Sequence, residues 1–249
     1  MKIAESFILI TGAAKRLGRE MALRLAQEEA SLVLHYNRSK REAEELQEEV
    51  EGLGGRAYLV RADLSAGKGN LVPRLKQFVG EVYRKVPGVD VLINNASIFY
   101  PAPFGKIKES DWDKLMSVNL KAPFFLAQEI GLRMLKQRRG KIINLIDWTA
   151  MKPRKNYLPY AVSKAGLQAA TIGLARTLAP HVQVLGIAPG PVLPPKGTNR
   201  KAAGEIISKT LLKRFGHPSD ISETVRFLIA GTDFMTGAVI PVEGGASVF

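Results

Sequence analysis

Short apolar runs alternate with longer amphipathic stretches along this chain, and this alternation limits the possible folds more than any other feature. Several of the runs are apolar at every position, which indicates strands buried on both faces of a sheet. Such strands, joined by helices, form parallel sheets with right-handed crossover connections. We therefore expect a single doubly wound α/β domain over residues 1–249, with about seven strands flanked by helices.

The same pattern predicts where the elements lie. Strands are predicted near Ser6–Ile10, Ser31–Tyr36, Ala57–Val60, Val89–Asn94, Lys141–Leu145, Gln183–Ala188 and Ala238–Val242. Helices are predicted near Leu17–Glu28, Lys40–Leu53, Leu71–Lys85, Asp111–Arg138, Tyr160–Leu178 and Ser219–Ala230. The densest Pro/Gly segment, 188–197, follows the sixth strand, so residues 189–212 are predicted to form a substrate loop or lid at the carboxyl edge.

Composition excludes several kinds of chemistry. The 249 residues include no cysteine, so disulfides, Fe–S clusters and a thiolate nucleophile are excluded. Three histidines without metal-ligand spacing make a metal site unexpected. The net charge of +13 suggests an anionic partner, but the basic residues are interleaved with acidic ones, so we expect neither nucleic acid nor membrane. With no long apolar run and no signal-peptide pattern, we expect a cytoplasmic protein.

The first predicted strand runs into a glycine-containing turn and then a helix start. This is the context in which a helix N-terminus offers free N–H groups to a pyrophosphate. Gly12 permits the turn, and Gly18 allows the helix to pack closely against the strand. The sequence therefore predicts a dinucleotide site at this turn.

The end of the second strand indicates which dinucleotide binds. An NAD site usually has an acidic residue here for the ribose 2′-hydroxyl, whereas this chain has His35-Tyr36-Asn37-Arg38-Ser39. Arg16 places a second guanidinium beside the turn, and guanidinium groups pair with phosphate in a bidentate manner. These residues favour a 2′-phosphate and hence NADPH.

Three polar residues form a candidate catalytic group. Tyr160 and Lys164 are four residues apart on a predicted helix, so they lie on one face. A neighbouring ammonium is expected to lower the pKa of the phenol, which would let Tyr160 donate a proton in the reduction of a C=O or C=N bond. Asp147 follows the fifth strand, at the edge where ligands of open α/β folds bind.

Together these residues resemble the short-chain dehydrogenase/reductase superfamily over essentially the whole chain. Further matching pieces are Thr11–Gly18, Asp63, Asn94-Asn95-Ala96-Ser97, Asn119, Pro189-Gly190 and Glu243-Gly244-Gly245. The resemblance implies a Rossmann-like fold, a homotetramer and hydride transfer, with Tyr160 as proton donor, Lys164 as its partner and Asn119 in a proton relay. It also implies that NADPH contacts Gly12, Lys15, Arg16, Leu17, Gly18, His35, Asn37, Arg38, Ser39, Asp63, Leu64, Asn94, Ala96, Ser97, Tyr160, Lys164, Pro189 and Gly190.

Two departures from the commonest pattern point to a subfamily. Arg16 replaces a glycine of the turn, and Asp147 replaces the usual catalytic serine. Both are similar to the pteridine reductases, and this resemblance implies that Phe99 stacks a pterin while Asp147 and Tyr160 form the proton-donating pair. The implied substrate-binding residues are Ser97, Phe99, Asp147 and Tyr160. The flat, N–H-rich pterin ring suits an aromatic face and a carboxylate acceptor.

We therefore expect an NADPH-dependent reductase of a pterin, dihydropterin or dihydrofolate ring. A 3-oxoacyl-carrier-protein reductase is the nearest alternative, although its catalytic serine is absent. A non-catalytic NADP-binding regulator that uses the +13 charge is a more distant one. Basic residues near the pocket, Lys152, Arg154, Lys155 and Lys196, suggest attraction of an anionic substrate tail, with a solvated loop as the alternative.

Overall fold

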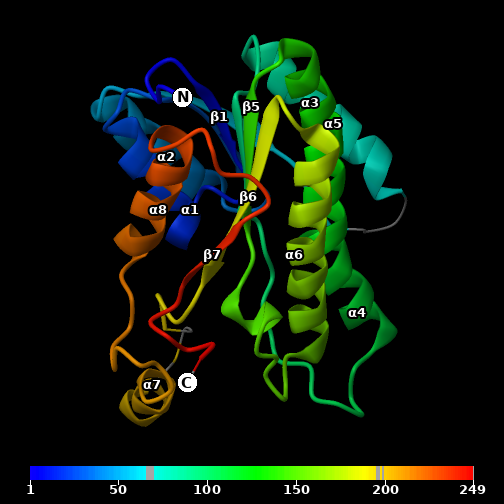
Figure 1. Ribbon diagram of the computed structural model, residues 1–249, viewed down its shortest axis with the longest axis vertical. Helices are drawn as coiled ribbons and strands as arrows, with labels where there is room; N and C mark the ends of the chain where they lie inside the picture. The colour runs from blue at the N-terminus through cyan, green and yellow to red at the C-terminus, as the bar shows by residue number, and fades with distance from the viewer. Residues whose placement is uncertain (66–69, 195–196, 198, 249) are drawn as a thin grey trace.

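The computed structural model describes residues 1–65, 70–194, 197 and 199–248, and its centre is a parallel sheet. Seven strands pair in the order β3-β2-β1-β4-β5-β6-β7, which confirms the predicted doubly wound α/β domain (Figure 1). The strands are β1 (Phe7–Ile10), β2 (Ser31–Tyr36), β3 (Arg56–Arg61), β4 (Val91–Asn94), β5 (Gly140–Leu145), β6 (Val182–Pro189) and β7 (Val239–Val242).

Helices cover both faces of the sheet. In Figure 1, α1, α2 and α8 lie on one side of the strands, and α3, α5 and α6 lie on the other. The helices are α1 (Arg16–Ala26), α2 (Lys40–Gly52), α3 (Leu71–Lys85), α4 (Glu109–Met116), α5 (Ala122–Gln137), α6 (Leu158–Leu178), α7 (Arg200–Ile207) and α8 (Pro218–Ala230). Two short segments, the π-helix η1 (Ser117–Lys121) and the 3₁₀-helix η2 (Trp148–Ala150), join this set.

The uniformly apolar strands are explained by two separate cores. Along β1, Ile8 and Ile10 pack into the core beneath α1 and α8, while Leu9 packs into the core beneath α3 and α5. Successive side chains of a strand point to opposite faces, so a strand covered on both sides needs apolar residues throughout. All three side chains are fully buried.

One stretch that was predicted as a continuous helix is interrupted in the structure. The stretch expected as a single helix over Asp111–Arg138 is divided into α4, the π-helix η1 and α5. The buried amide of Asn119, inside η1, bonds to the backbone of Ile98 and to the Ser163 hydroxyl. These bonds lie outside the helix, and periodicity along the sequence carries no signal for them.

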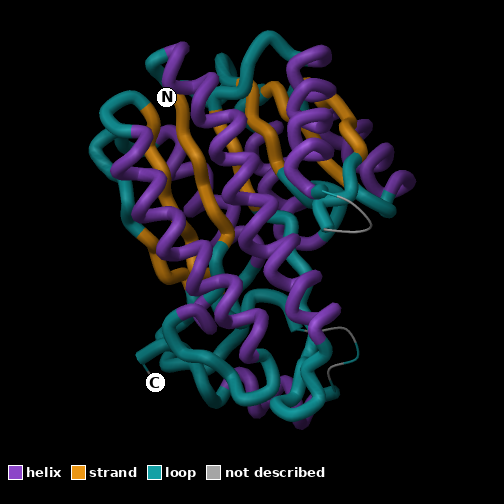
Figure 2. Tube along the Cα trace, turned by 90° about the vertical axis from the view of Figure 1, so that its right-hand side faces the viewer, coloured by secondary structure: helices purple, strands orange, loops and turns teal. Residues whose placement is uncertain are grey.

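The site-bearing end of the domain lies where the strands end. Strand order reverses between β1 and β4, and the crevice outside the carboxyl ends at such a point is where open α/β folds bind ligands. Helix α7 lies beyond the sheet at this end, near the C-terminus and far from the N-terminus, as Figures 1 and 2 show. It occupies the segment predicted as a loop or lid, in which no helix was expected.

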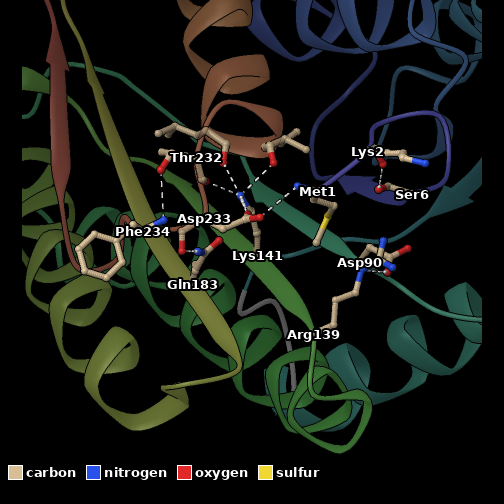
Figure 3. A network of polar contacts seen from close by, with 12 residues as sticks. Met1, Lys2, Ser6, Asp90, Arg139, Lys141, Gln183, Thr232, Asp233 and Phe234 are labelled. Atoms are coloured by element: carbon tan, nitrogen blue, oxygen red, sulfur yellow. Dashed lines mark hydrogen bonds and ion pairs between the residues drawn. The ribbon is translucent and has the colours of Figure 1, made fainter.

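A buried lysine joins the sheet to helix α8 on the opposite side from the site. The Lys141 ammonium donates to the backbone carbonyls of Leu228, Ile229 and Thr232 at 2.9–3.0 Å, and it pairs with Asp233 at 2.8 Å (Figure 3). The carbonyls at a helix C-terminus lack intrahelical partners and carry a partial negative charge. Lys141 therefore caps α8 from the neighbouring strand, although its side chain is almost completely buried.

Candidate active site

A cavity of about 1580 Å³ opens at the carboxyl edge of the sheet. Its wall is formed by the turn after β1, the ends of β2 and β4, the segment after β5, the start of α6, the segment after β6, and α7. Pockets that hold one drug-sized ligand measure roughly 300–1,000 Å³, so this cavity has room for two ligands side by side. Most of the residues that the sequence singles out meet here.

The glycine turn after β1 is built for close approach. Gly12 has a φ of +63°, and a Cβ there would lie 3.1 Å from the Cα of Ala96. A Cβ on Gly18 would lie 2.3 Å from the carbonyl oxygen of Gly12, so Gly18 allows α1 to pack against the turn as expected. Arg16 has a φ of +54°, a left-handed conformation that costs a non-glycine residue roughly 1–2 kcal/mol.

His35 holds this turn in place from β2. Its Nδ1 accepts a hydrogen bond from the Gly12 N–H at 3.0 Å, and its Nε2 lies 3.2 Å from the Ala62 carbonyl oxygen. Burial lowers the pKa of His35 from 6.5 to about 4, so the ring is neutral with the proton on Nε2. His35, expected as a cofactor contact, thus also acts on the cofactor site through the Gly12 amide.

Two guanidinium groups and one carboxylate line the same end of the cavity. Arg16 and Arg38 are exposed, and within the described part of the chain neither forms an ion pair. Burial raises the pKa of Asp63, but hydrogen bonds from Ser65 and nearby positive charges, including that of Arg38, outweigh it and leave the pKa below its usual value. This end of the cavity therefore offers two guanidinium groups to a phosphate, beside the Asp63 carboxylate, which can accept hydrogen bonds.

Asp147 and Tyr160 are hydrogen-bonded at the centre of the cavity. The Tyr160 hydroxyl donates to Oδ2 of Asp147 at 2.9 Å. Oδ1 of Asp147 accepts from both the backbone N–H and the hydroxyl of Thr149, at 2.8 and 2.7 Å. Thr149 is buried on η2, so it fixes the carboxylate with one oxygen turned toward Tyr160.

The pKa of Tyr160 is raised, whereas the neighbouring Lys164 predicted a lowered one. Burial raises the pKa of the Tyr160 phenol well above its usual value, and the Asp147 carboxylate raises it further. The Lys164 ammonium instead donates to the Leu145 carbonyl at 2.8 Å and lies 5.9 Å from the centre of the Tyr160 ring. Burial lowers the pKa of Lys164 itself to about 8, against a smaller opposing effect of Asp147.

Aromatic rings form the wall beside this pair. Phe99 stacks on Tyr157 with ring centres 4.6 Å apart and planes 3° apart. It meets Tyr160 edge-on at 4.8 Å. The Arg154 guanidinium lies over the other ring of the stack, 5.0 Å from the centre of Tyr157. Phe99 keeps 44% of its surface exposed, so a flat ligand has an aromatic face to stack on.

A polar chain leads from this pair into the protein. Ser97 donates a hydrogen bond to Oδ1 of Asn119 at 3.1 Å, and Asn119 donates to the Ser163 hydroxyl at 3.2 Å. The Ser97 hydroxyl also interacts with the Tyr160 phenol and lowers its pKa slightly against the effects named above. Asn119 therefore lies behind the cavity wall and reaches Tyr160 through Ser97.

The expected residues divide by their position. Those on the cavity wall are Gly12, Lys15, Arg16, Leu17, His35, Asn37, Arg38, Asp63, Leu64, Ala96, Ser97, Phe99, Asp147, Lys152, Arg154, Tyr160, Lys164, Pro189 and Gly190. Gly18, Ser39, Asn94, Asn119 and Lys155 are absent from the wall, and Lys196 lies outside the described residues. The side-chain amide of Asn94 donates to Asn144 and to the Pro123 carbonyl in the core.

Three residues of the site received no role from the sequence. Asn95 donates to the carbonyls of Thr11 and Gly12, which ties β4 to the glycine turn. Thr149 and Tyr157 hold Asp147 and Phe99 as described above. The spacing of Tyr157 and Tyr160 on one helical face was a usable signal for the aromatic wall.

Two searches of the described residues concern metal sites and membrane-spanning helices. No group of three or more histidine, aspartate or glutamate side chains there is arranged to hold a metal ion. Among the same residues, no helix is both long and apolar enough to pass through a bilayer.

Comparison with known proteins adds three findings. The family described as short chain dehydrogenase matches residues 6–204. The 3-oxoacyl-(acyl-carrier-protein) reductases FabG of Staphylococcus epidermidis and Thermotoga maritima are 33% and 34% identical, over 95% and 98% of this chain and 97% and 99% of theirs. The crystal structure of FolM alternative dihydrofolate reductase 1 from Brucella canis, complexed with NADP, has a TM-score of 0.91 and 30% identity, covering 100% of this chain and 96% of that one.

Proposed function

This chain belongs to the short-chain dehydrogenase family, and from that premise we propose that it is an NADPH-dependent reductase of the C=N bond in a pterin or dihydropterin ring. Dihydrofolate contains the same ring and falls within the proposal. The pairing of Asp147 with Tyr160 beside the exposed face of Phe99 carries it. The name of the FolM relative, an alternative dihydrofolate reductase, supports the same chemistry.

The residues present fit NADPH. The Gly12 turn leaves no room for a side chain, as close approach of a pyrophosphate requires. Arg16 and Arg38 would pair with the 2′-phosphate, and Asp63 would accept from the adenine amino group. Pro189 and Gly190, at the end of β6, would border the nicotinamide. When bound, NADPH supplies the hydride.

Tyr160 would donate the proton to the ring nitrogen. Its raised pKa keeps the proton on oxygen until negative charge develops on that nitrogen, and the nearby Lys164 ammonium stabilises the phenolate that is left. Asp147 accepts from Tyr160 in the free protein, and N–H groups of the pterin would take that place on binding. This exchange would release the Tyr160 hydroxyl to turn toward the substrate.

A second candidate function is reduction of a 3-oxoacyl thioester. The names of the FabG relatives favour it, since they cover nearly the whole chain. The carbonyl oxygen of such a substrate accepts hydrogen bonds but offers no N–H group. Asp147 would then face an acceptor rather than a donor, which makes this function less compatible with the site.

Side-by-side assays separate these functions. NADPH oxidation is measured with dihydrobiopterin, dihydrofolate and an acetoacetyl thioester for the wild type and for Asp147→Ser. We expect pterin turnover in the wild type and its loss in Asp147→Ser, because serine holds the pterin N–H groups less well. Turnover of the thioester alone, retained in Asp147→Ser, would refute the pterin proposal. Salt-sensitive nucleic-acid binding without oxidation of NADPH would instead favour a non-catalytic NADP-binding regulator.

We also propose that the enzyme is a cytoplasmic homotetramer. Apolar side chains on α5 and α6 are exposed, namely Phe124, Leu132, Val162 and Ile172. We infer that these side chains are covered when subunits associate. Light scattering after gel filtration tests the assembly, with Leu132→Glu and Ile172→Glu expected to reduce the mass, and fractionation of the source cells tests the location.

A further inference from the structure

The Asp147 carboxylate receives more hydrogen bonds from its own segment than the local turn requires. Asp147 precedes the 3₁₀-helix η2, and the bond from the Thr149 N–H to its Oδ1, at 2.8 Å, already caps this helix. The Thr149 hydroxyl adds a second donor to the same oxygen at 2.7 Å. The cap accounts for the first bond, whereas the second bond needs another explanation.

This hydroxyl is bonded differently from threonine hydroxyls on α6 and α8. Those of Thr171, Thr177 and Thr224 each donate to the backbone carbonyl four residues earlier in their helix. The Thr149 hydroxyl instead donates to a carboxylate, and its side chain is almost completely buried where η2 packs against α6. A hydrogen bond to a carboxylate is stronger than one to a neutral carbonyl, so Thr149 constrains Asp147 firmly.

Three donors together fix the plane of this carboxylate. The terminal torsion of an aspartate side chain has a broad energy minimum, so a single hydrogen bond leaves the carboxylate free to turn. Here Oδ1 accepts from both donors of Thr149, and Oδ2 accepts from the Tyr160 hydroxyl at 2.9 Å. Each carboxylate oxygen offers about two acceptor positions, so Oδ1 is fully occupied and the remaining position is on Oδ2.

This arrangement brings substrate recognition and proton donation to one atom. A ring N–H that bonds to Asp147 does so at Oδ2, the oxygen to which the Tyr160 hydroxyl is bonded. We propose that Thr149 is a positioning residue, whose hydroxyl holds Asp147 so that Oδ2 meets both the Tyr160 hydroxyl and an N–H group of the substrate. The substrate contact rests on the proposed function, whereas the contact with Tyr160 concerns the protein before any substrate binds.

The test removes the Thr149 hydroxyl and then restores it. Thr149→Val keeps the branched shape and the backbone N–H but places a methyl group against Oδ1, so the carboxylate turns and Oδ2 moves away from Tyr160. Thr149→Ser keeps the hydroxyl. The matched control is Thr224→Val, which removes a threonine hydroxyl on α8, outside the cavity wall. If Thr149→Val does not fold, Thr149→Ala removes the same hydroxyl without adding a group in its place.

The kinetic result distinguishes positioning from a general loss of structure. For reduction of dihydrobiopterin by NADPH, we expect Thr149→Val to lower kcat/KM roughly 10- to 100-fold, the effect of losing a hydrogen bond to a charged group. Thr149→Ser should remain within about 3-fold of the wild type and Thr224→Val within about 2-fold, and the Kd for NADPH should change less than about 2-fold in every variant. A serine variant as slow as the valine variant, a valine variant as fast as the wild type, or a parallel loss of NADPH affinity would overturn the proposal.

A measurement on the protein without substrate keeps this inference separate from the reaction. The protein is labelled with fluorotyrosine, and the fluorine NMR resonance of Tyr160 is identified among those of the six tyrosines by its absence in Tyr160→Phe. We expect Thr149→Val to displace this resonance in the same direction as Asp147→Ala, and Thr149→Ser to leave it in place. An unmoved resonance in Thr149→Val overturns the proposal. If the resonance moves while the wild type reduces no pterin, the proposed reaction is refuted and the positioning of Asp147 by Thr149 is supported.

Discussion

Replacing Arg16 by glycine should change the stability and the NADPH affinity in opposite directions. The residue occupies a left-handed conformation, with a φ of +54°, at the start of α1. Arg16→Gly and Arg16→Ala remove the same guanidinium, but only glycine relieves the backbone strain. The two variants therefore separate the charge from the conformation.

The magnitudes follow from the structure. Left-handed strain costs roughly 1–2 kcal/mol, and the greater freedom of glycine in the unfolded chain costs about 0.5–1 kcal/mol. Arg16→Gly should thus be about 0.5–1 kcal/mol more stable than Arg16→Ala, which raises the Tm by roughly 1–4 °C for a chain of this size. Loss of an exposed guanidinium that pairs with a phosphate should cost about 1–2 kcal/mol, or roughly 5- to 30-fold in the Kd for NADPH.

Thermal unfolding without cofactor and fluorescence titration with NADPH and NADH measure the two effects. Both variants should lose NADPH affinity equally, and the Kd for NADH should change less than about 2-fold, because NADH lacks the 2′-phosphate. A glycine variant that is less stable than the alanine variant would refute the strain argument. Equal losses of NADPH and NADH affinity would refute the assigned role of the guanidinium.

Three further predictions concern titration and buried charge. His35→Gln should remove an acid-sensitive part of the stability. The neutral form of His35 is favoured in the folded state, so its contribution is full above pH 6.5 and falls by about 3 kcal/mol between pH 6.5 and about 4, and urea unfolding at several pH values should show a flatter decline over this range in the variant. In the wild type, kcat/KM for reduction should fall as the pH rises through about 8, where Lys164 loses its proton, and a pH–rate profile without such a decline would contradict the stabilising role of its ammonium. Lys141→Met should destabilise the protein by about 3–5 kcal/mol because it leaves buried carbonyls unpaired. Asp233→Asn, on a side chain that is 70% exposed, should cost less than about 1 kcal/mol. If chemical denaturation gives equal losses for the two variants, the ion pair rather than the helix cap is the source of the stability.

Much of the fold was accessible from local pattern. Burial on both faces makes several strands apolar at nearly every position, and the predicted positions of β1 to β7 agree with the structure to within about two residues. The glycine turn and the residues after β2 were recognisable because a phosphate site needs backbone conformations and charges that few residue types supply. Helix α3 begins and ends where the periodicity indicated.

The parts that were not predicted depend on contacts between distant segments. Whether Lys164 lowers the pKa of Tyr160 depends on where its ammonium points. The ammonium is held by the carbonyl of Leu145, nineteen residues earlier in the chain. Helix α7 has little intrinsic signal, because it buries no residue and follows a Pro/Gly-rich segment. Spacing along the chain contains neither kind of information.

The π-turn at Ser117–Lys121 has a consequence for how this region can vary. A π-turn contains one residue more than the α-turn it replaces, so the side chains before it are rotated by about 100° relative to an uninterrupted helix. Lys114 and Val118 face the cavity, while Ala122 and Leu126 remain in the core on the far side of the turn. Because of this single extra residue, the side chains before the turn face the cavity while those after it pack in the core. Substitutions on α4 can therefore change what enters the cavity without disturbing the packing of α5.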